Sequence, residues 1–122
     1  MINLLNEAVE ITKKALNNNN VIINPIEDQD KVINFLNFIY EKLVDLNEKE
    51  STKNDYNKIF QSSVLKATIG IIKYSATKIL SDSINDPKKF IEYIDSIYNN
   101  QVELEKKELK RLESNGEFDP LW

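Results

Sequence analysis

Only carboxylates, lysines and hydroxyl groups are available for chemistry in this chain, because its 122 residues include no His and no Cys. The acid–base pairs of Ser/His/Asp and Cys/His hydrolases are therefore excluded, and so are zinc sites built from imidazole or thiolate. The two glycines, Gly70 and Gly116, are isolated, and neither precedes a Lys-Ser or Lys-Thr pair, so the sequence contains no phosphate-binding loop. We expect a chain that is not an enzyme and uses no cofactor.

The densest carboxylate cluster is formed by Glu27, Asp28 and Asp30. A calcium loop needs further oxygen ligands at alternate positions and a central glycine, whereas aliphatic residues follow this cluster. In the first turn of a helix, by contrast, each acid complements the helix dipole and typically stabilises it by about 0.3 to 1 kcal/mol. The sequence therefore favours a role at a helix start and predicts no bound metal.

The charge distribution argues against direct binding of nucleic acid. The formal net charge is −4, and residues 25–50 alone sum to −4, with seven acids and three lysines. Lysine exceeds acid only in residues 51–85, and Arg111 is the single arginine, whereas phosphate-tracking surfaces need clustered Lys and Arg. Lys66 and Lys73 lie seven residues apart and suit an anion-binding or catalytic pair, but extension from the edge of a core is favoured.

The scarcity of glycine and proline, together with apolar residues recurring every three or four positions, predicts an all-α protein. We expect a single compact bundle of about four helices, with a central apolar third helix and a long C-terminal helix. The expected helices span about residues 2–17, 24–46, 55–81 and 86–115. The bundle domain is predicted at 1–116, followed by a short apolar tail at 117–122.

The third expected helix carries two apolar rows, which predicts that it is surrounded by partners. The rows are Phe60, Val64, Ala67, Ile71 and Tyr74, and Leu65, Ile69, Ile72, Ala76 and Ile79. Gly70 lowers helix propensity by about 1 kcal/mol relative to Ala and is interpreted as the point where another helix crosses closely. Three lysines in the run Val64–Leu80 identify it as a core helix and exclude a membrane span.

The ends and edges of the other helices give further expectations. Asn24 is predicted to cap the second helix, with Pro25 at its first position and Glu27 reaching back in a capping-box-like pair. Phe35 and Phe38 lie at the edge of the apolar arc, and packing against the first helix is favoured over a partner-binding edge. The charged end of the fourth helix is interpreted as a solvated extension, with a dimer seam as the alternative.

The N-terminal residues contain no basic segment typical of a secretory signal, and we expect a cytoplasmic protein. Phe118, Leu121 and Trp122 make the tail half apolar. Burying each is worth roughly 2 kcal/mol, and ordering the backbone costs about 1 kcal/mol or more per residue, so the two terms nearly cancel. The tail is expected to dock weakly on its own bundle, a partner or a second copy.

These observations favour a non-catalytic protein-binding module, an acidic inhibitor or immunity-type protein acting on a basic partner. Its candidate contact residues are Glu27, Asp28, Asp30, Phe118, Leu121 and Trp122. Small acidic helical proteins that neutralise bacteriocins or nuclease toxins are similar in size, charge and architecture, an analogy at the level of fold class alone. The alternatives are a structural protein acting through homo-oligomerisation and a regulator linked to nucleic acid through a partner. A monomer or a homodimer is expected.

Overall fold

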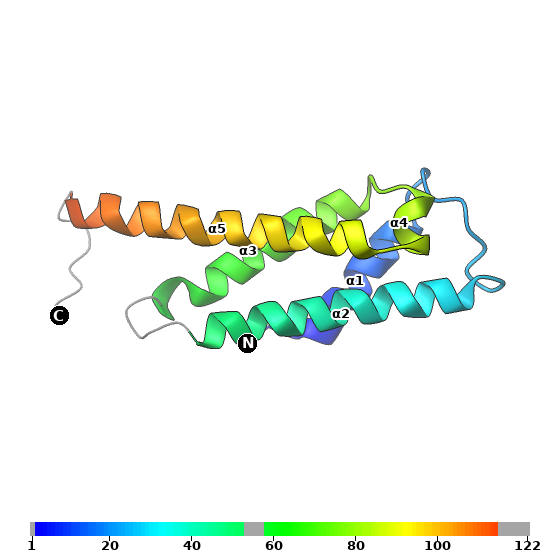
Figure 1. The fold of residues 1–122 in the computed structure, drawn as a ribbon, viewed down its shortest axis with the longest axis horizontal. Coiled ribbons are helices and arrows are strands. Elements are labelled where there is room, and N and C mark those ends of the chain that lie inside the picture. Colours follow the sequence, from blue (N-terminus) through cyan, green and yellow to red (C-terminus); the bar gives the residue numbers. More distant parts are fainter. Residues whose placement is uncertain (1, 53–57, 115–122) are drawn as a thin grey trace.

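The computed structural model describes residues 2–52 and 58–114, and in the second range the side chains are described from residue 64 onward. These residues form five helices and no strand, which confirms the all-α prediction (Figure 1). The helices are α1 (Leu4–Leu16), α2 (Gln29–Ser51), α3 (Lys58–Ala76), α4 (Ser81–Asn85) and α5 (Lys88–Ser114).

Helix α3 packs against α1, α2 and α5, and α2 packs against all four other helices. The long helices α2 and α5 run lengthwise through the molecule, and the single-turn helix α4 lies at the end where α5 begins (Figure 1). Between these helices lies one continuous hydrophobic core, whose largest fully buried apolar side chains are Phe35, Ile11, Ile39, Leu43, Leu46, Leu65, Ile72, Ile84 and Ile94. The compact all-α bundle is therefore confirmed, with five helices where about four were predicted.

Helix α1 begins where the sequence supplies a cap. The side chain of Asn3 accepts a hydrogen bond from the backbone N–H of Asn6 at 3.0 Å, which satisfies one of the amide groups that a helix start leaves without a partner. The buried residues of α1 are Ala8, Ile11, Thr12 and Ala15, whereas Leu5 is 58% exposed.

Helix α2 starts later than predicted and continues to Ser51, beyond the expected end at residue 46. The predicted cap Asn24 does not cap α2, whose N-cap is Asp28; the Oδ1 of Asn24 accepts hydrogen bonds from the amides of Ile26 and Glu27 in the turn before the helix. The reciprocal bond, however, comes from Asp28, whose carboxylate accepts from the Asn24 amide at 3.2 Å. The turn at 25–28 precedes the helix, so the predicted role of Glu27 in a capping box was wrong.

From Val64 onward, where its side chains are described, helix α3 is buried along one side only, and this corrects two predictions; Phe60 of the first predicted row lies outside the described side chains. Leu65, Ile69 and Ile72 face the core, whereas Ile71 is 37% exposed and Tyr74 is 67% exposed. Gly70 is exposed, and a Cβ added there would meet no atom within 4 Å. No helix therefore crosses closely at Gly70. The helix also ends at Ala76, five residues before the predicted end, and α4 follows as a separate turn.

Helix α5 begins just after Asp86-Pro87, as predicted, and the Asp86 carboxylate accepts a hydrogen bond from the amide of Lys88. Phe35 is fully buried, and its ring stacks on Phe90 of α5 with ring centroids 5.9 Å apart. Phe35 is thus a core residue, although its aromatic partner is α5, and Phe38 is partly buried. Glu105 and Leu109 are both buried, so the last turns of α5 are not fully solvated.

Candidate interaction surface between helices α3 and α5

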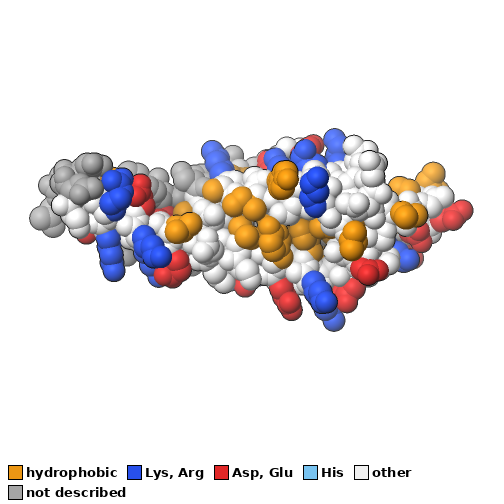
Figure 2. Space-filling view, turned by 90° about the horizontal axis from the view of Figure 1, so that it is seen from above, with side chains coloured by type: hydrophobic (Ala, Val, Ile, Leu, Met, Phe, Trp, Pro, Cys, Tyr) orange, Lys and Arg blue, Asp and Glu red, His pale blue; other side chains and the backbone are white. Residues whose placement is uncertain are grey.

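An apolar face is left exposed between α3 and α5, and two cavities are formed on it. It consists of Ala67, Ile71 and Tyr74 of α3 and of Tyr93, Ile97 and Leu104 of α5, and we call it the α3–α5 face. One cavity lies towards α4, and the other towards the C-terminal end of α5. Figure 2 looks down on α3 and α5 and shows hydrophobic side chains gathered near the middle of this side of the molecule.

Both helices follow the same spacing rule along this face. Ala67 lines one cavity and Tyr74 the other, and Ile71 lies between them, four and three residues away. On α5, the half-buried Ile97 lies four residues after Tyr93 and seven before Leu104, and the polar Gln101 of the cavity lining lies in the longer interval. Residues spaced by three, four or seven share one side of a helix, so α3 contributes a continuous apolar stripe and α5 contributes one that Gln101 interrupts. The antiparallel packing of α3 on α5 brings the two stripes together.

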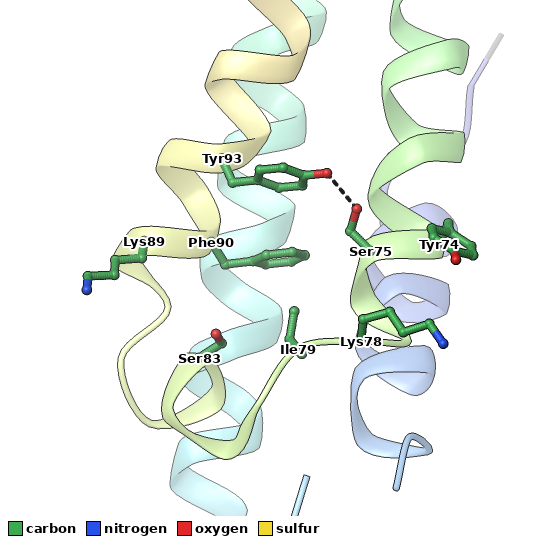
Figure 3. Close-up of a pocket in the computed structure, with 8 residues that line it drawn as sticks. All are labelled: Tyr74, Ser75, Lys78, Ile79, Ser83, Lys89, Phe90 and Tyr93. Carbon is green, nitrogen blue, oxygen red and sulfur yellow. Dashed lines mark hydrogen bonds between the residues drawn. The ribbon is translucent and has the colours of Figure 1, made fainter. Parts of the chain in front are cut away.

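The cavity beside α4, here called the aromatic cavity, has a volume of about 350 Å³. In Figure 3 the rings of Phe90 and Tyr93 extend from α5 towards α3, and Ile79 lies below them. The Tyr93 hydroxyl and the Ser75 hydroxyl are hydrogen-bonded at 2.7 Å across the cavity. This exposed bond links α3 and α5 at this end of the face.

Stacked aromatic rings connect the aromatic cavity to the core. Phe35 is fully buried and stacks on Phe90, which in turn stacks on Tyr93 with ring centroids 6.2 Å apart. Tyr93 is 39% exposed. The floor of the cavity is held by packed rings, which favours a preformed surface.

The second cavity, here called the distal cavity, has a volume of about 560 Å³. Its apolar lining comes from Val64, Ala67 and Leu104, of which Leu104 is 48% exposed. At its outer end Arg111 donates to both carboxylate oxygens of Glu108, at 2.7 and 3.3 Å. This hydrogen bonding lowers the pKa of Glu108 below its ordinary value.

Positive charge predominates around the α3–α5 face, although the whole chain is acidic. Lys78 and Lys89 lie at the aromatic cavity and Lys107 at the distal cavity, and all three are exposed. Within the described residues, none of these lysines forms an ion pair. The exposed acid lining the face, Glu108, is paired with Arg111. The rim thus has an excess of cations.

A buried polar contact supports α5 on the side away from this face. Tyr98 donates a hydrogen bond to the carboxylate of Glu50 at 2.5 Å, and Tyr98 and Glu50 are only 3% and 1% exposed. Burial raises the pKa of Tyr98 well above its ordinary value, and the hydrogen bond and negative charge of Glu50 add to the increase. The hydroxyl therefore stays protonated and links α5 to the end of α2.

The acidic residues that the sequence singled out lie away from this face. Glu27 and Asp30 are exposed at the start of α2 and do not line either cavity. Asp28 is engaged locally, because it accepts from the Asn24 amide and lies 3.7 Å from the Lys31 ammonium. The three tail residues, Phe118, Leu121 and Trp122, lie outside the described residues. The structure therefore does not bring Glu27, Asp28 or Asp30 to the α3–α5 face.

Lys66 and Lys73 do not form an isolated cationic pair. Lys73 forms an ion pair with Glu7 of α1 at 2.7 Å, whereas Lys66 is exposed. The signal for the α3–α5 face is present in the sequence as the first apolar row of α3, which contains Ala67, Ile71 and Tyr74. Both rows of α3 were predicted to be core, because apolar periodicity does not show which stripes are covered.

Residues 2–52 and 58–114 contain no group of three or more His, Cys, Asp or Glu placed to hold a metal ion. None of the five described helices has the length and apolar content needed to cross a membrane.

Comparison of the chain with protein-family models, curated proteins and solved structures finds no match.

Proposed function

We propose that this chain is a non-catalytic protein-binding module whose contact surface is the α3–α5 face. The observation that carries the proposal is the pair of apolar stripes that α3 and α5 leave exposed side by side, with a cavity at each end. Contiguous apolar surface rimmed by charge is typical of interaction sites, whereas scattered exposed apolar residues are not. The fixed aromatic floor lowers the cost of ordering such a surface on binding.

The partner that fits this face is an amphipathic helix with acidic flanks, supplied by another protein. Two antiparallel helices form a groove in which a third helix can lay its apolar side chains. Lys78, Lys89 and Lys107 then face acidic groups of the partner, and such complementarity raises association rates and specificity. A second copy of the chain, docked face to face, would bring the lysines of the two rims close together. Repulsion between these like charges disfavours a second copy as the occupant.

A display selection tests this proposal and does not require the natural partner to be identified. Random 18-residue peptides are selected on the full-length chain and counter-selected on the Ile71→Glu/Leu104→Glu variant. The enriched peptides should have apolar residues three and four apart and a net negative charge, and added salt should weaken their binding.

The matched control is Leu5→Glu/Ile22→Glu, because these residues are also exposed and lie outside the α3–α5 face. Peptides enriched on the wild type should bind this control unchanged and lose most of their affinity for the double variant on the face. Selection of the same peptides by both variants would contradict the proposal. A dimer that Ile71→Glu dissociates in light scattering would replace it with self-assembly.

A second candidate is the inhibition of a basic partner through the start of α2. The observation that favours it is the exposure of Glu27 and Asp30, neither of which forms an ion pair within the described residues. Asp28 is a weaker contact residue because it already binds Asn24 and Lys31. Glu27→Lys/Asp30→Lys should slow association with a lysine-rich peptide at low salt, measured by stopped flow. An unchanged association rate would contradict a role of Glu27 and Asp30 in binding a basic partner.

A further inference from the structure

We propose that the distal cavity is occupied by residues 117–122 of the same chain, which compete there with an external partner. Occupancy by this segment does not depend on the proposed function, whereas the competition rests on it. Three features of the chain support the assignment: the chemistry of the segment, its reach and its charge.

The chemistry of the segment matches the cavity. Phe118, Leu121 and Trp122 are large apolar residues, and the lining of the distal cavity of about 560 Å³ includes the apolar Val64 and Ala67 of α3 and Leu104 of α5 beside charged residues of α5. Leu104 is 48% exposed in that wall and offers the contact that such side chains need. Placing these side chains there removes apolar surface of both the segment and the wall from water.

The reach of the segment is sufficient. Helix α5 is described to Ser114, and Leu104 lies ten residues earlier, or about 15 Å along the axis at 1.5 Å per residue. A chain that reverses direction at Asn115-Gly116 has six residues left, which span up to about 20 Å when extended. Glycine allows such a reversal because it adopts left-handed conformations at little cost. The segment therefore reaches the whole distal cavity.

The charge of the segment suits one residue of the rim. Glu117 and Asp119 alternate with the apolar residues, so residues 117–122 have a formal charge of −2. Lys107 is exposed at the distal cavity and forms no ion pair among the described residues, although Glu105, Glu108 and Arg111 bring the formal charge of the whole lining to zero. An acidic, apolar segment is the same kind of occupant that the α3–α5 face selects from other proteins. The aromatic cavity lies at the other end of the face and remains open to a partner.

The emission of Trp122 tests the docking directly, because it is the only tryptophan of the chain. In the full-length protein we expect a blue-shifted maximum that persists on dilution. Leu104→Glu should shift the emission maximum to longer wavelength. It should also lower the docking equilibrium constant about tenfold, because the free energy of one Leu-sized apolar contact is large enough for a change of that size. Lys107→Glu should give a smaller shift in the same direction.

The matched controls are Leu5→Glu and Lys14→Glu, which make the same substitutions at exposed positions of α1. Both should leave the emission unchanged, and circular dichroism should show the same helix content in all four variants. Solvent-exposed emission in the wild type, or a maximum that does not respond to Leu104→Glu, would overturn the proposal. So would a blue shift that disappears on dilution, because the occupant would then be a second copy.

Competition between residues 117–122 and an external partner is tested by peptide binding. Trp122→Ala should raise the affinity of peptides selected on the α3–α5 face, since the segment no longer excludes them. If Trp122 emission responds to Leu104→Glu but no peptide is selected, the docking stands and the proposed function fails. If peptides are selected but Trp122 emission is that of an exposed residue, the proposed function stands and the docking is refuted.

Discussion

The two sides of α3 are both apolar in sequence, yet they have opposite environments. Leu65, Ile69 and Ile72 are at most 3% exposed, and they face α1, α2 and α5. On the other side Ile71 and Tyr74 are 37% and 67% exposed. Composition does not explain the difference, because Ile71 and Ile72 are the same residue type in adjacent positions.

This difference shows that the number of neighbouring helices limits how much apolar surface a helix can bury. A helix apolar around most of its circumference needs partners on all sides. Helix α5 packs against α3 from one flank only, so the outer row of α3 joins the outer row of α5 as a shared surface. Binding on the open side would account for the excess apolar residues.

The largest effect on stability is expected for the buried side of α3. Ile72→Ala should destabilise the bundle by about 2 to 5 kcal/mol, because it removes a fully buried side chain and leaves a cavity. The change is measured as a shift of the midpoint in urea denaturation followed by circular dichroism. Ile71→Ala is the control on the opposite side and should cost less than about 1 kcal/mol. Equal costs would mean that the α3–α5 face is covered in solution.

A smaller effect is expected for the two tyrosine hydroxyls of α5. Tyr98→Phe should destabilise the protein by about 1 to 3 kcal/mol, because it removes the donor that Tyr98 offers to a buried carboxylate. Tyr93→Phe removes an exposed hydrogen bond to Ser75 and should change the free energy of unfolding by about 0.5 kcal/mol or less. Denaturation of both variants under identical conditions measures the contrast. A larger loss of stability for Tyr93→Phe would show that the Tyr93–Ser75 hydrogen bond holds α3 and α5 together.

The smallest effect is expected at Gly70 and has the opposite sign. Gly70→Ala should stabilise the protein by about 0.5 to 1 kcal/mol, because alanine favours the helix and a Cβ at this position meets open space. The measurement is the shift in thermal midpoint. Destabilisation would restore the interpretation of Gly70 as a close crossing point and would place a partner on this side of α3.

Much of the fold was predictable because it depends on local signals. The Asp86-Pro87 start of α5 and the termination of α1 after Leu16 follow from capping residues and the Asn run at 17–20. Helix ends set by side-chain competition were less predictable. Asp28, rather than Glu27, completes the bond to Asn24, because the chain makes a turn there before the helix begins.

The candidate site was predictable only in part. The charged residues Glu27, Asp28 and Asp30 are conspicuous because acids cluster there in sequence, yet their surroundings are local to the start of α2. The lysines around the α3–α5 face are separated by up to 29 positions, from Lys78 to Lys107, so no window of sequence shows them together. Lys78 lies between α3 and α4, whereas Lys89 and Lys107 lie on α5, and the return of α5 along α3 places all three around one face.

The sequence alone determined the all-α class, the helical periods and the absence of histidine and cysteine chemistry, because these depend on composition and short-range spacing. The tertiary structure decided which apolar rows became core and which remained open. That choice depends on how many helices surround α3 and on which side α5 lies, and both are long-range properties of the packed bundle. Ile71 and Ile72 differ for this reason.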